Sequence, residues 1–151
     1  MSGLEDLYQE VILDHSRRPR NSGALPDAGA SAEGYNPLCG DRVRVHLTTD
    51  GDRIEEIRFE GVGCAISTAS ASLMTEVVKG KRVAEALDLH QRFHELLTGD
   101  PSVREVAGPE LGKLAVFSGV REFPVRVKCA TLPWHTLKQA LAEGRGSVST
   151  E

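Results

Sequence analysis

Apolar residues near the start of the chain recur with the period of an α-helix. They are Leu4, Leu7, Tyr8, Val11 and Ile12. This spacing places their side chains on one helical face and predicts an amphipathic helix over residues 3–16, which ends before Pro19. Residues 19–37 contain several glycines and prolines and few apolar residues, so they predict a long loop.

The next part of the chain alternates between apolar and polar residues, as half-buried strands do. Residues 42–48 alternate strictly, and residues 54–61 resume the alternation after an Asp–Gly turn signal. Ile54 is out of phase with the apolar residues that follow it, which predicts a bulge or a late strand start near Glu55. With a short third strand over residues 62–66, we expect a small three-stranded antiparallel sheet.

The rest of the chain favours helices. Residues 67–79 and 82–97 each predict one helix, and the weak pattern of residues 102–122 predicts one or two short turns. Residues 124–143 predict a final helical region that Pro133 should break or restart. Helices gathered on one face of an antiparallel sheet define an α+β fold class.

Length and charge narrow the class of protein further. The 151 residues suit one domain, which we place at residues 1–143, followed by a frayed polar tail at 144–151. The chain has 18 basic and 22 acidic residues, so its net charge is negative. We therefore expect neither nucleic acid nor an anionic membrane as its partner. No apolar run approaches the length of a membrane span, and the first residues do not have the pattern of a signal peptide.

The three cysteines are the most informative residues. Their odd number excludes a complete internal disulfide framework, so we expect a cytoplasmic protein with reduced thiols. Cys39 and Asp41 lie two residues apart, Cys64 precedes a predicted helix start that favours the thiolate, and Cys129 lies in the final helical region. Three thiolates and one carboxylate suffice for a tetrahedral zinc site. Spacing alone leaves open whether they converge, since a free cysteine is often a small buried apolar residue.

The five histidines are weaker candidates. His90 and His94 have a spacing that can chelate a metal, but no third ligand of suitable spacing accompanies them, so we interpret them as an exposed helix face. His15 and His46 are expected to be solvated. His135, six residues after the third cysteine, could approach the cysteine site.

The segments around the cysteines resemble the three cysteine motifs of the IscU/NifU N-terminal family. They read Cys-Gly-Asp from Cys39, Gly-Val-Gly-Cys-Ala-Ile-Ser-Thr-Ala-Ser around Cys64, and Arg-Val-Lys-Cys-Ala-Thr-Leu around Cys129. The N-terminal Leu-Tyr-x-Glu-Val-Ile-Leu-Asp-His segment and the Pro-Arg-Asn after it are also similar to the family, and the resemblance covers residues 4–143. It implies a SufE/IscU-like α+β fold and a role in iron–sulfur cluster assembly, with sulfur supplied by a pyridoxal-phosphate-dependent cysteine desulfurase.

Departures from the housekeeping scaffolds indicate a branch of that family. Lys128 stands where those scaffolds have histidine, and residues 122–126 differ from the segment that a dedicated Hsp70-type chaperone recognises. The stretch between Cys64 and Cys129 is also longer than in those scaffolds. These features are similar to the SufU-like branch, whose members bind zinc and accept persulfide sulfur from a SufS-type desulfurase.

The resemblance implies a role for each candidate residue. Cys39, Asp41, Cys64 and Cys129 would hold one Zn²⁺, and Cys39 would be the persulfide acceptor after a partner histidine displaces it from the metal. Arg126 would offset the negative charge of the ligands or stabilise a freed thiolate, and an ordinary surface or salt-bridge role is equally open. The protein would then act as a sulfurtransferase-like partner of the desulfurase and pass sulfur to the downstream assembly machinery, rather than work as a stand-alone enzyme.

Two other functions stay open. In the first, the protein is a scaffold on which Cys39, Cys64 and Cys129 hold a [2Fe–2S] cluster before its transfer to apo-proteins. A charged Lys128 in the position of a histidine weakens this interpretation, because an ammonium group is not a ligand. In the second, the zinc site is purely structural, which we disfavour because structural sites usually combine Cys and His pairs close in sequence.

Overall fold

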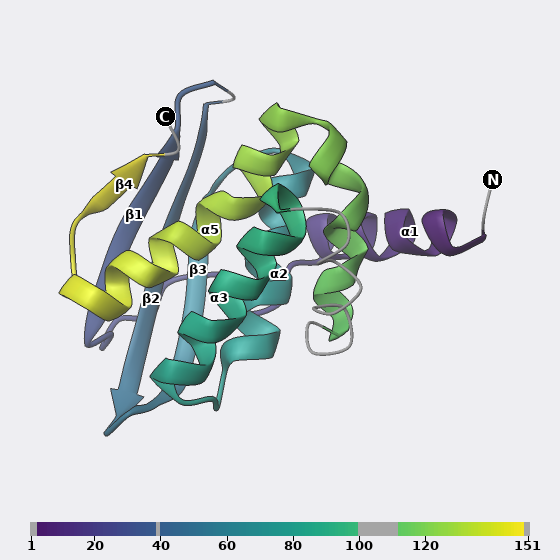
Figure 1. Cartoon of the computed structure of the whole chain (residues 1–151). Helices are drawn as coiled ribbons and strands as arrows, with labels where there is room; N and C mark the ends of the chain where they lie inside the picture. Colours follow the sequence, from purple (N-terminus) through teal and green to yellow (C-terminus); the bar gives the residue numbers. More distant parts are fainter. Residues whose placement is uncertain (1–2, 39, 100–111, 150–151) are drawn as a thin grey trace.

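The computed structural model describes residues 3–38, 40–99 and 112–149 (Figure 1). In chain order, the elements are α1 (Gly3–Arg17), β1 (Ala30–Asn36), β2 (Asp41–Asp50), β3 (Arg53–Val62), α2 (Ala65–Val78), α3 (Val83–Thr98), the 3₁₀ helix η1 (Gly112–Glu122), α5 (Pro124–Glu143) and β4 (Ser147–Ser149). The described helices gather on one side of the sheet, which confirms the α+β class (Figure 1). None of the described helices is long and apolar enough to cross a membrane.

The sheet has four strands in the order β3-β2-β1-β4, instead of the three that the sequence predicts. Strands β1, β2 and β3 pair antiparallel, but the third antiparallel strand is Ala30–Asn36 and not residues 62–66. The prediction was wrong here because the buried positions of β1 are Ala32, Gly34 and Asn36, which carry no apolar alternation that a pattern could reveal. The residues after Val62 instead lead into α2.

The fourth strand comes from the tail that we expected to be frayed. Helix α5 ends at Glu143 and is capped by Gly144, whose φ of 73° is the left-handed conformation common after a helix. The chain then turns back along the edge of the sheet, where Ser31 and Glu33 donate backbone hydrogen bonds to the carbonyls of Gly144 and Gly146. Strand β4 pairs parallel to β1 through such main-chain bonds, so its formation needs no apolar side-chain pattern.

The predicted irregularity at Glu55 is confirmed. Thr48 pairs with Glu56 and Thr49 pairs with Ile54, so Glu55 is an extra residue in β3. The bulge lets Ile54 point into the core, where it is fully buried, despite being out of phase with the residues that follow it.

Helix α5 runs without interruption through Pro133, so the predicted break is wrong. Proline removes one backbone hydrogen bond from the helix. On both sides of Pro133, however, the helix is buried against the sheet and α2, with Leu132, Trp134 and Leu137 in the core. Packing on both sides of the proline therefore offsets the missing hydrogen bond.

Gly34 marks the closest approach between the sheet and α5. A Cβ atom at this position would overlap Thr136 Oγ1 and would lie 3.0 Å from Leu132 Cδ1. We expect Gly34→Ala to lower the free energy of unfolding by about 1–3 kcal/mol, because neither neighbour can move out of a packed core. Urea denaturation measures this change.

Two further variants control this prediction. Gly29→Ala introduces the same methyl group where the nearest heavy atom is 4.0 Å away, and it should leave the unfolding free energy nearly unchanged. Thr136→Ala removes the overlapping oxygen, so it should reduce the cost of Gly34→Ala when the two are combined. Equal destabilisation by Gly34→Ala in both backgrounds would show that this contact is not the cause.

Candidate metal centre

Three of the four predicted ligands come together in the structure. One ligand atom each of Asp41, Cys64 and Cys129 lies within 4.8 Å of the other two. Asp41 begins β2, Cys64 is the N-cap of α2, and Cys129 lies in the second turn of α5. The fold therefore assembles this group of side chains from three elements that are far apart in sequence.

Cys64 is held on two sides. As N-cap of α2, its Sγ accepts a hydrogen bond from the backbone N–H of Ser67 at 3.4 Å, at the positive end of the helix dipole. Its own backbone N–H donates to Asp41 Oδ1 at 2.9 Å, and its Sγ lies 3.6 Å from Asp41 Oδ2. The carboxylate and the thiol are therefore fixed relative to each other by the strand start and the helix start.

Cys129 is buried, and its environment includes a residue that sequence reasoning missed. Asn36 is buried at the end of β1, and its Nδ2 donates to Cys129 Sγ at 3.7 Å. The side-chain oxygen of Asn36 also accepts a hydrogen bond from the backbone N–H of Leu38 at 3.2 Å. The backbone carbonyl of Asn36 accepts one from the backbone N–H of Gly40 at 2.8 Å. Asn36 thus ties the third cysteine to the segment that carries the first one. The sequence feature that could have drawn attention to Asn36 is the Asn–Pro pair just before the first cysteine motif.

The fourth predicted ligand, Cys39, lies outside the described residues. Its neighbours Leu38 and Gly40 are both exposed, and Gly40 has a left-handed φ of 73°. Arg126, predicted to offset ligand charge, is exposed and places its guanidinium 4.6 Å from the centre of the Phe123 ring. A role for Arg126 beside the ligands stays a prediction.

The residues that are present fit a zinc ion. Zinc–sulfur bonds of about 2.3 Å place the ligand atoms of a tetrahedral site roughly 3.5–3.8 Å apart. The 3.6 Å between Cys64 Sγ and Asp41 Oδ2 lies in this range, and the other ligand atoms need only small shifts. Asp41 and Cys129 are buried and Cys64 is half-buried, so the group is largely shielded from water.

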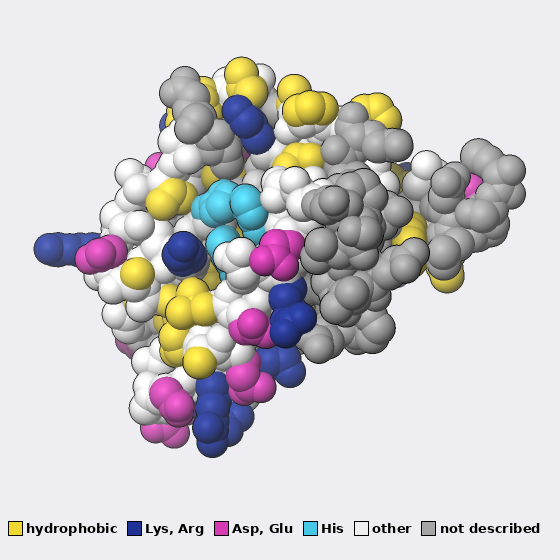
Figure 2. Space-filling view, in the orientation of Figure 1, with side chains coloured by type: hydrophobic (Ala, Val, Ile, Leu, Met, Phe, Trp, Pro, Cys, Tyr) yellow, Lys and Arg dark blue, Asp and Glu magenta, His cyan; other side chains and the backbone are white. Residues whose placement is uncertain are grey.

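The histidines do not lie where the sequence suggested. His15 and His46 are buried, and so is His90, which was expected on an exposed helix face. His135 does not join the cysteines: its Nδ1 lies 3.3 Å from His90 Nε2, and its ring is in edge contact with that of His94. Figure 2 shows histidine side chains gathered at the centre of one face of the molecule. Burial lowers the pKa of His90 to about 4, and burial also lowers the pKa values of His15 and His135.

Comparison with known proteins agrees with this fold and site. Residues 7–143 match the family model for the NifU-like N terminal domain, so the chain belongs to this family. The chain is 42% identical over 148 residues to the zinc-dependent sulfurtransferase SufU of Bacillus subtilis, covering 96% of each chain. It is 44% identical over 141 residues to the iron–sulfur cluster assembly scaffold protein IscU of Streptococcus pyogenes, covering 93% of this chain and 86% of that one.

A solved structure shares the fold over most of this chain. It is an iron–sulfur cluster assembly scaffold protein of the SUF system from Fervidobacterium islandicum, with a TM-score of 0.78 and 38% sequence identity. The match covers 91% of this chain and 98% of that one. The resemblance that the cysteine motifs indicated is therefore confirmed over nearly the entire chain.

Proposed function

We propose that this protein is a zinc-dependent sulfur acceptor in iron–sulfur cluster assembly, which takes persulfide sulfur from a SufS-type cysteine desulfurase. The observation that carries the proposal is the convergence of Asp41, Cys64 and Cys129 from three elements. The similarity to a relative named as a zinc-dependent sulfurtransferase over 96% of the chain supports it. Transfer through free thiols requires a reducing compartment, so we place the protein in the cytoplasm.

In this proposal, Asp41, Cys64, Cys129 and Cys39 hold the zinc ion. When bound, zinc keeps its cysteine ligands in the thiolate form at neutral pH. Asp41 and the amide of Ser67 position Cys64, and Asn36 positions Cys129 through its hydrogen bond to the sulfur. These contacts hold two of the thiols in place, whereas the segment on either side of Cys39 is exposed.

Cys39 is the proposed acceptor. Its thiolate attacks the outer sulfur of the desulfurase persulfide, so that a new sulfur–sulfur bond forms on Cys39 while the old one breaks. The electron pair of the broken bond leaves with the cysteine of the desulfurase, which becomes a thiolate. The outer sulfur keeps its proton and is neither oxidised nor reduced overall.

Exposed apolar side chains next to the site residues support a protein partner. Tyr35 and Leu38 flank Asn36, while Phe123 and Val125 precede Cys129, and all four are large apolar side chains exposed to solvent. Apolar residues gathered around a site typically mark a protein contact surface. Such a surface suits a donor that delivers sulfur on its own cysteine.

A scaffold that builds a [2Fe–2S] cluster is the second candidate function. The similarity to relatives named as cluster assembly scaffolds favours it, and Cys39, Cys64 and Cys129 could ligate such a cluster. Lys128 argues against a cluster, because it stands in the position of a histidine and an ammonium group cannot replace a histidine ligand. Its side chain lines a pocket together with His135. Native mass spectrometry of protein purified without oxygen or chelator separates the two: one zinc per chain supports sulfur transfer, and an iron–sulfur adduct without zinc supports the scaffold.

Replacement of Cys39 by serine tests the acceptor assignment. The wild-type chain, incubated with a SufS-type desulfurase, pyridoxal phosphate and cysteine, should gain the mass of one sulfur atom, and peptide mapping after alkylation should locate it on Cys39. The Cys39→Ser chain should gain none, because the serine hydroxyl is not nucleophilic enough to accept sulfane sulfur. Cys64 and Cys129 serve as internal controls within the same digest. Persulfide on Cys39→Ser, or on Cys64 in the wild type, would contradict the assignment.

A further inference from the structure

Three histidines from two helices converge away from the thiolate group. His90 and His94 lie one turn apart on α3, and His135 faces them from α5. The Nε2 of His90 lies 3.3 Å from the Nδ1 of His135. The ring centres of His90 and His135 are 5.2 Å apart, and those of His94 and His135 are 5.8 Å apart.

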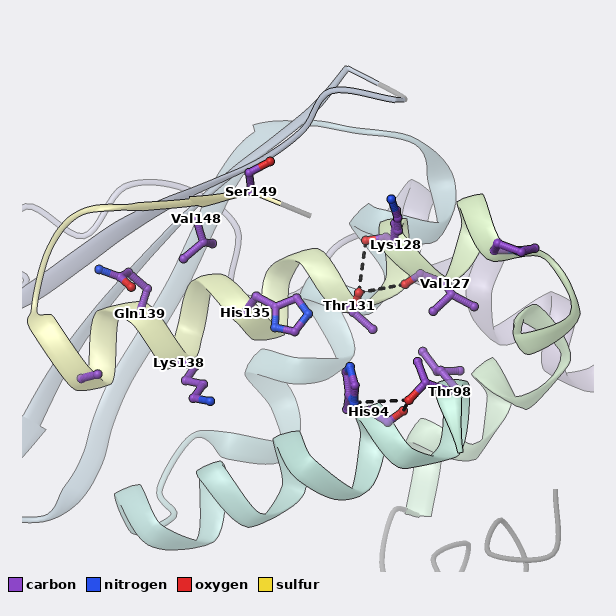
Figure 3. A pocket seen from close by; sticks show the side chains of 13 residues that line it. His94, Thr98, Val127, Lys128, Thr131, His135, Lys138, Gln139, Val148 and Ser149 are labelled. Carbon is purple, nitrogen blue, oxygen red and sulfur yellow. Dashed lines mark hydrogen bonds between the residues drawn. The ribbon is translucent and has the colours of Figure 1, made fainter. Parts of the chain in front are cut away.

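This cluster forms part of the wall of a pocket. The pocket has a volume of about 730 Å³ and is lined by His94 and His135 together with residues of α3, α5 and β4 (Figure 3). Figure 3 shows the rings of His94 and His135 on facing sides of this space, with Lys138 beside them. None of the described residues that line the pocket carries a carboxylate.

We propose that His90, His94 and His135 form a second metal site, separate from the thiolate centre, which binds one late first-row transition-metal ion such as Zn²⁺, Co²⁺ or Ni²⁺. The spacing of the nitrogens carries the proposal. Metal–nitrogen bonds of about 2.0–2.1 Å place two ligand nitrogens of a tetrahedral site roughly 3.4 Å apart. The 3.3 Å between His90 Nε2 and His135 Nδ1 already equals one edge of such a site.

His94 completes the site only after its ring rotates, because no choice of one nitrogen from each of the three rings lies within 4.8 Å of one another in this structure. The Thr98 hydroxyl donates to the backbone carbonyl of His94 at 2.7 Å and therefore accepts from His94 Nδ1 at 3.3 Å. This contact places the proton of the neutral ring on Nδ1 and leaves the lone pair on Nε2, as outer hydrogen bonds do for metal-bound histidines. Histidines four residues apart on a helix can chelate one ion, and the pocket leaves room for water as the fourth ligand.

The charges around the cluster set its selectivity. Burial keeps the pKa values of His90 and His135 below their ordinary value, so both rings are neutral at pH 7. One of the two nitrogens that meet at 3.3 Å carries a proton, and that ring must move its proton to its other nitrogen before both can bind the metal. Imidazole without thiolate suits Zn²⁺, Co²⁺ and Ni²⁺ rather than Mg²⁺ or Ca²⁺. The ammonium of Lys138 opposes a cation, but this side chain is exposed and can turn into solvent. We therefore expect a site weaker than the thiolate centre.

A cobalt titration of the full chain, preloaded with one equivalent of zinc, tests the site. Zinc binds thiolates more tightly than cobalt does, so added Co²⁺ should enter the histidine site. We expect one further equivalent with visible d–d bands and no near-ultraviolet thiolate-to-cobalt band. His94→Gln and His135→Gln should each weaken this uptake at least 10-fold, while Lys138→Gln should strengthen it.

His46→Gln is the matched control, because His46 lies on β2 and contacts Ser31 and Glu60 instead of the cluster. It should bind cobalt as the wild type does. Absence of a second equivalent, a thiolate-to-cobalt band in its place, or unchanged affinity in both His94→Gln and His135→Gln would each overturn the proposal. Circular dichroism of each variant shows that the fold is retained, and His94 is only half-buried, so its replacement leaves the core intact.

Discussion

Replacement of Asp41 by asparagine is expected to lower the affinity of the protein for zinc about 100-fold or more while leaving the fold intact. Asp41 is buried, and one of its carboxylate oxygens lies within 4.8 Å of the sulfur atoms of Cys64 and Cys129. Asparagine keeps the shape, and its Oδ1 can still accept the backbone hydrogen bond of Cys64. It removes the negative charge, however, and a neutral amide is a poor zinc ligand. Competition with a chromophoric chelator measures the affinity.

Asp50→Asn is the matched control, because this residue ends the same strand at an exposed position. It should bind zinc as tightly as the wild type. The unfolding free energies of metal-free Asp41→Asn and metal-free wild type should be similar, which would separate loss of the metal from loss of the fold. If Asp41→Asn kept wild-type zinc affinity, the carboxylate would not be a ligand.

Acidification from pH 7.5 to pH 5 is expected to lower the free energy of unfolding by about 2 kcal/mol through His90 alone. Burial, with smaller contributions from the nearby His135, Lys138 and His94, lowers the pKa of His90 to about 4 in the folded chain. The unfolded chain therefore binds more protons between this value and the ordinary pKa of 6.5, so stability rises with pH in this window and is lost as the pH falls. The lowered pKa values of His15 and His135 act in the same direction.

Urea denaturation at a series of pH values measures this loss, and His90→Gln isolates its cause. The variant carries the same thiolate group, and both proteins are measured free of metal, so neither the thiolate centre nor the proposed histidine site contributes to the difference. The decline of stability between pH 7.5 and pH 5 should be shallower in His90→Gln than in the wild type. A wild-type stability that is flat or increases toward pH 5 would contradict the prediction. Asp14 and Glu56, whose lowered pKa values arise from Arg20 and Lys79, affect stability only in a more acidic range.

Much of the fold was predictable because its signals are local. The apolar period of α1, the alternation of β2 and β3 and the phase error at Ile54 each depend on residues within one element. Strand β1 could not be found this way, since the side chains that it buries are small or polar and its place is set by pairing with β2. The continuation of α5 through Pro133 likewise depends on packing from other elements.

In the candidate metal centre, too, some features have local sequence signals and others depend on tertiary packing. The order and surroundings of the three cysteines in the sequence were enough to indicate the family. They also predicted Cys39, Asp41, Cys64 and Cys129 as ligands, of which the structure brings the last three together. The partners that position them, such as Asn36 beside Cys129, come from distant segments, so local spacing does not reveal which ligand they contact.

The sequence by itself determined the α+β class, the family and the candidate residues of the thiolate group, because these depend on residue identity and short-range spacing. Only the tertiary structure decided that His135 faces His90 and His94 rather than Cys129, which created the histidine cluster. The physical reason is that a contact between residues 45 positions apart depends on how α3 and α5 pack together. The helical period determines on which face of a helix a side chain lies. Only the packing of the helices against one another determines which residues that face contacts.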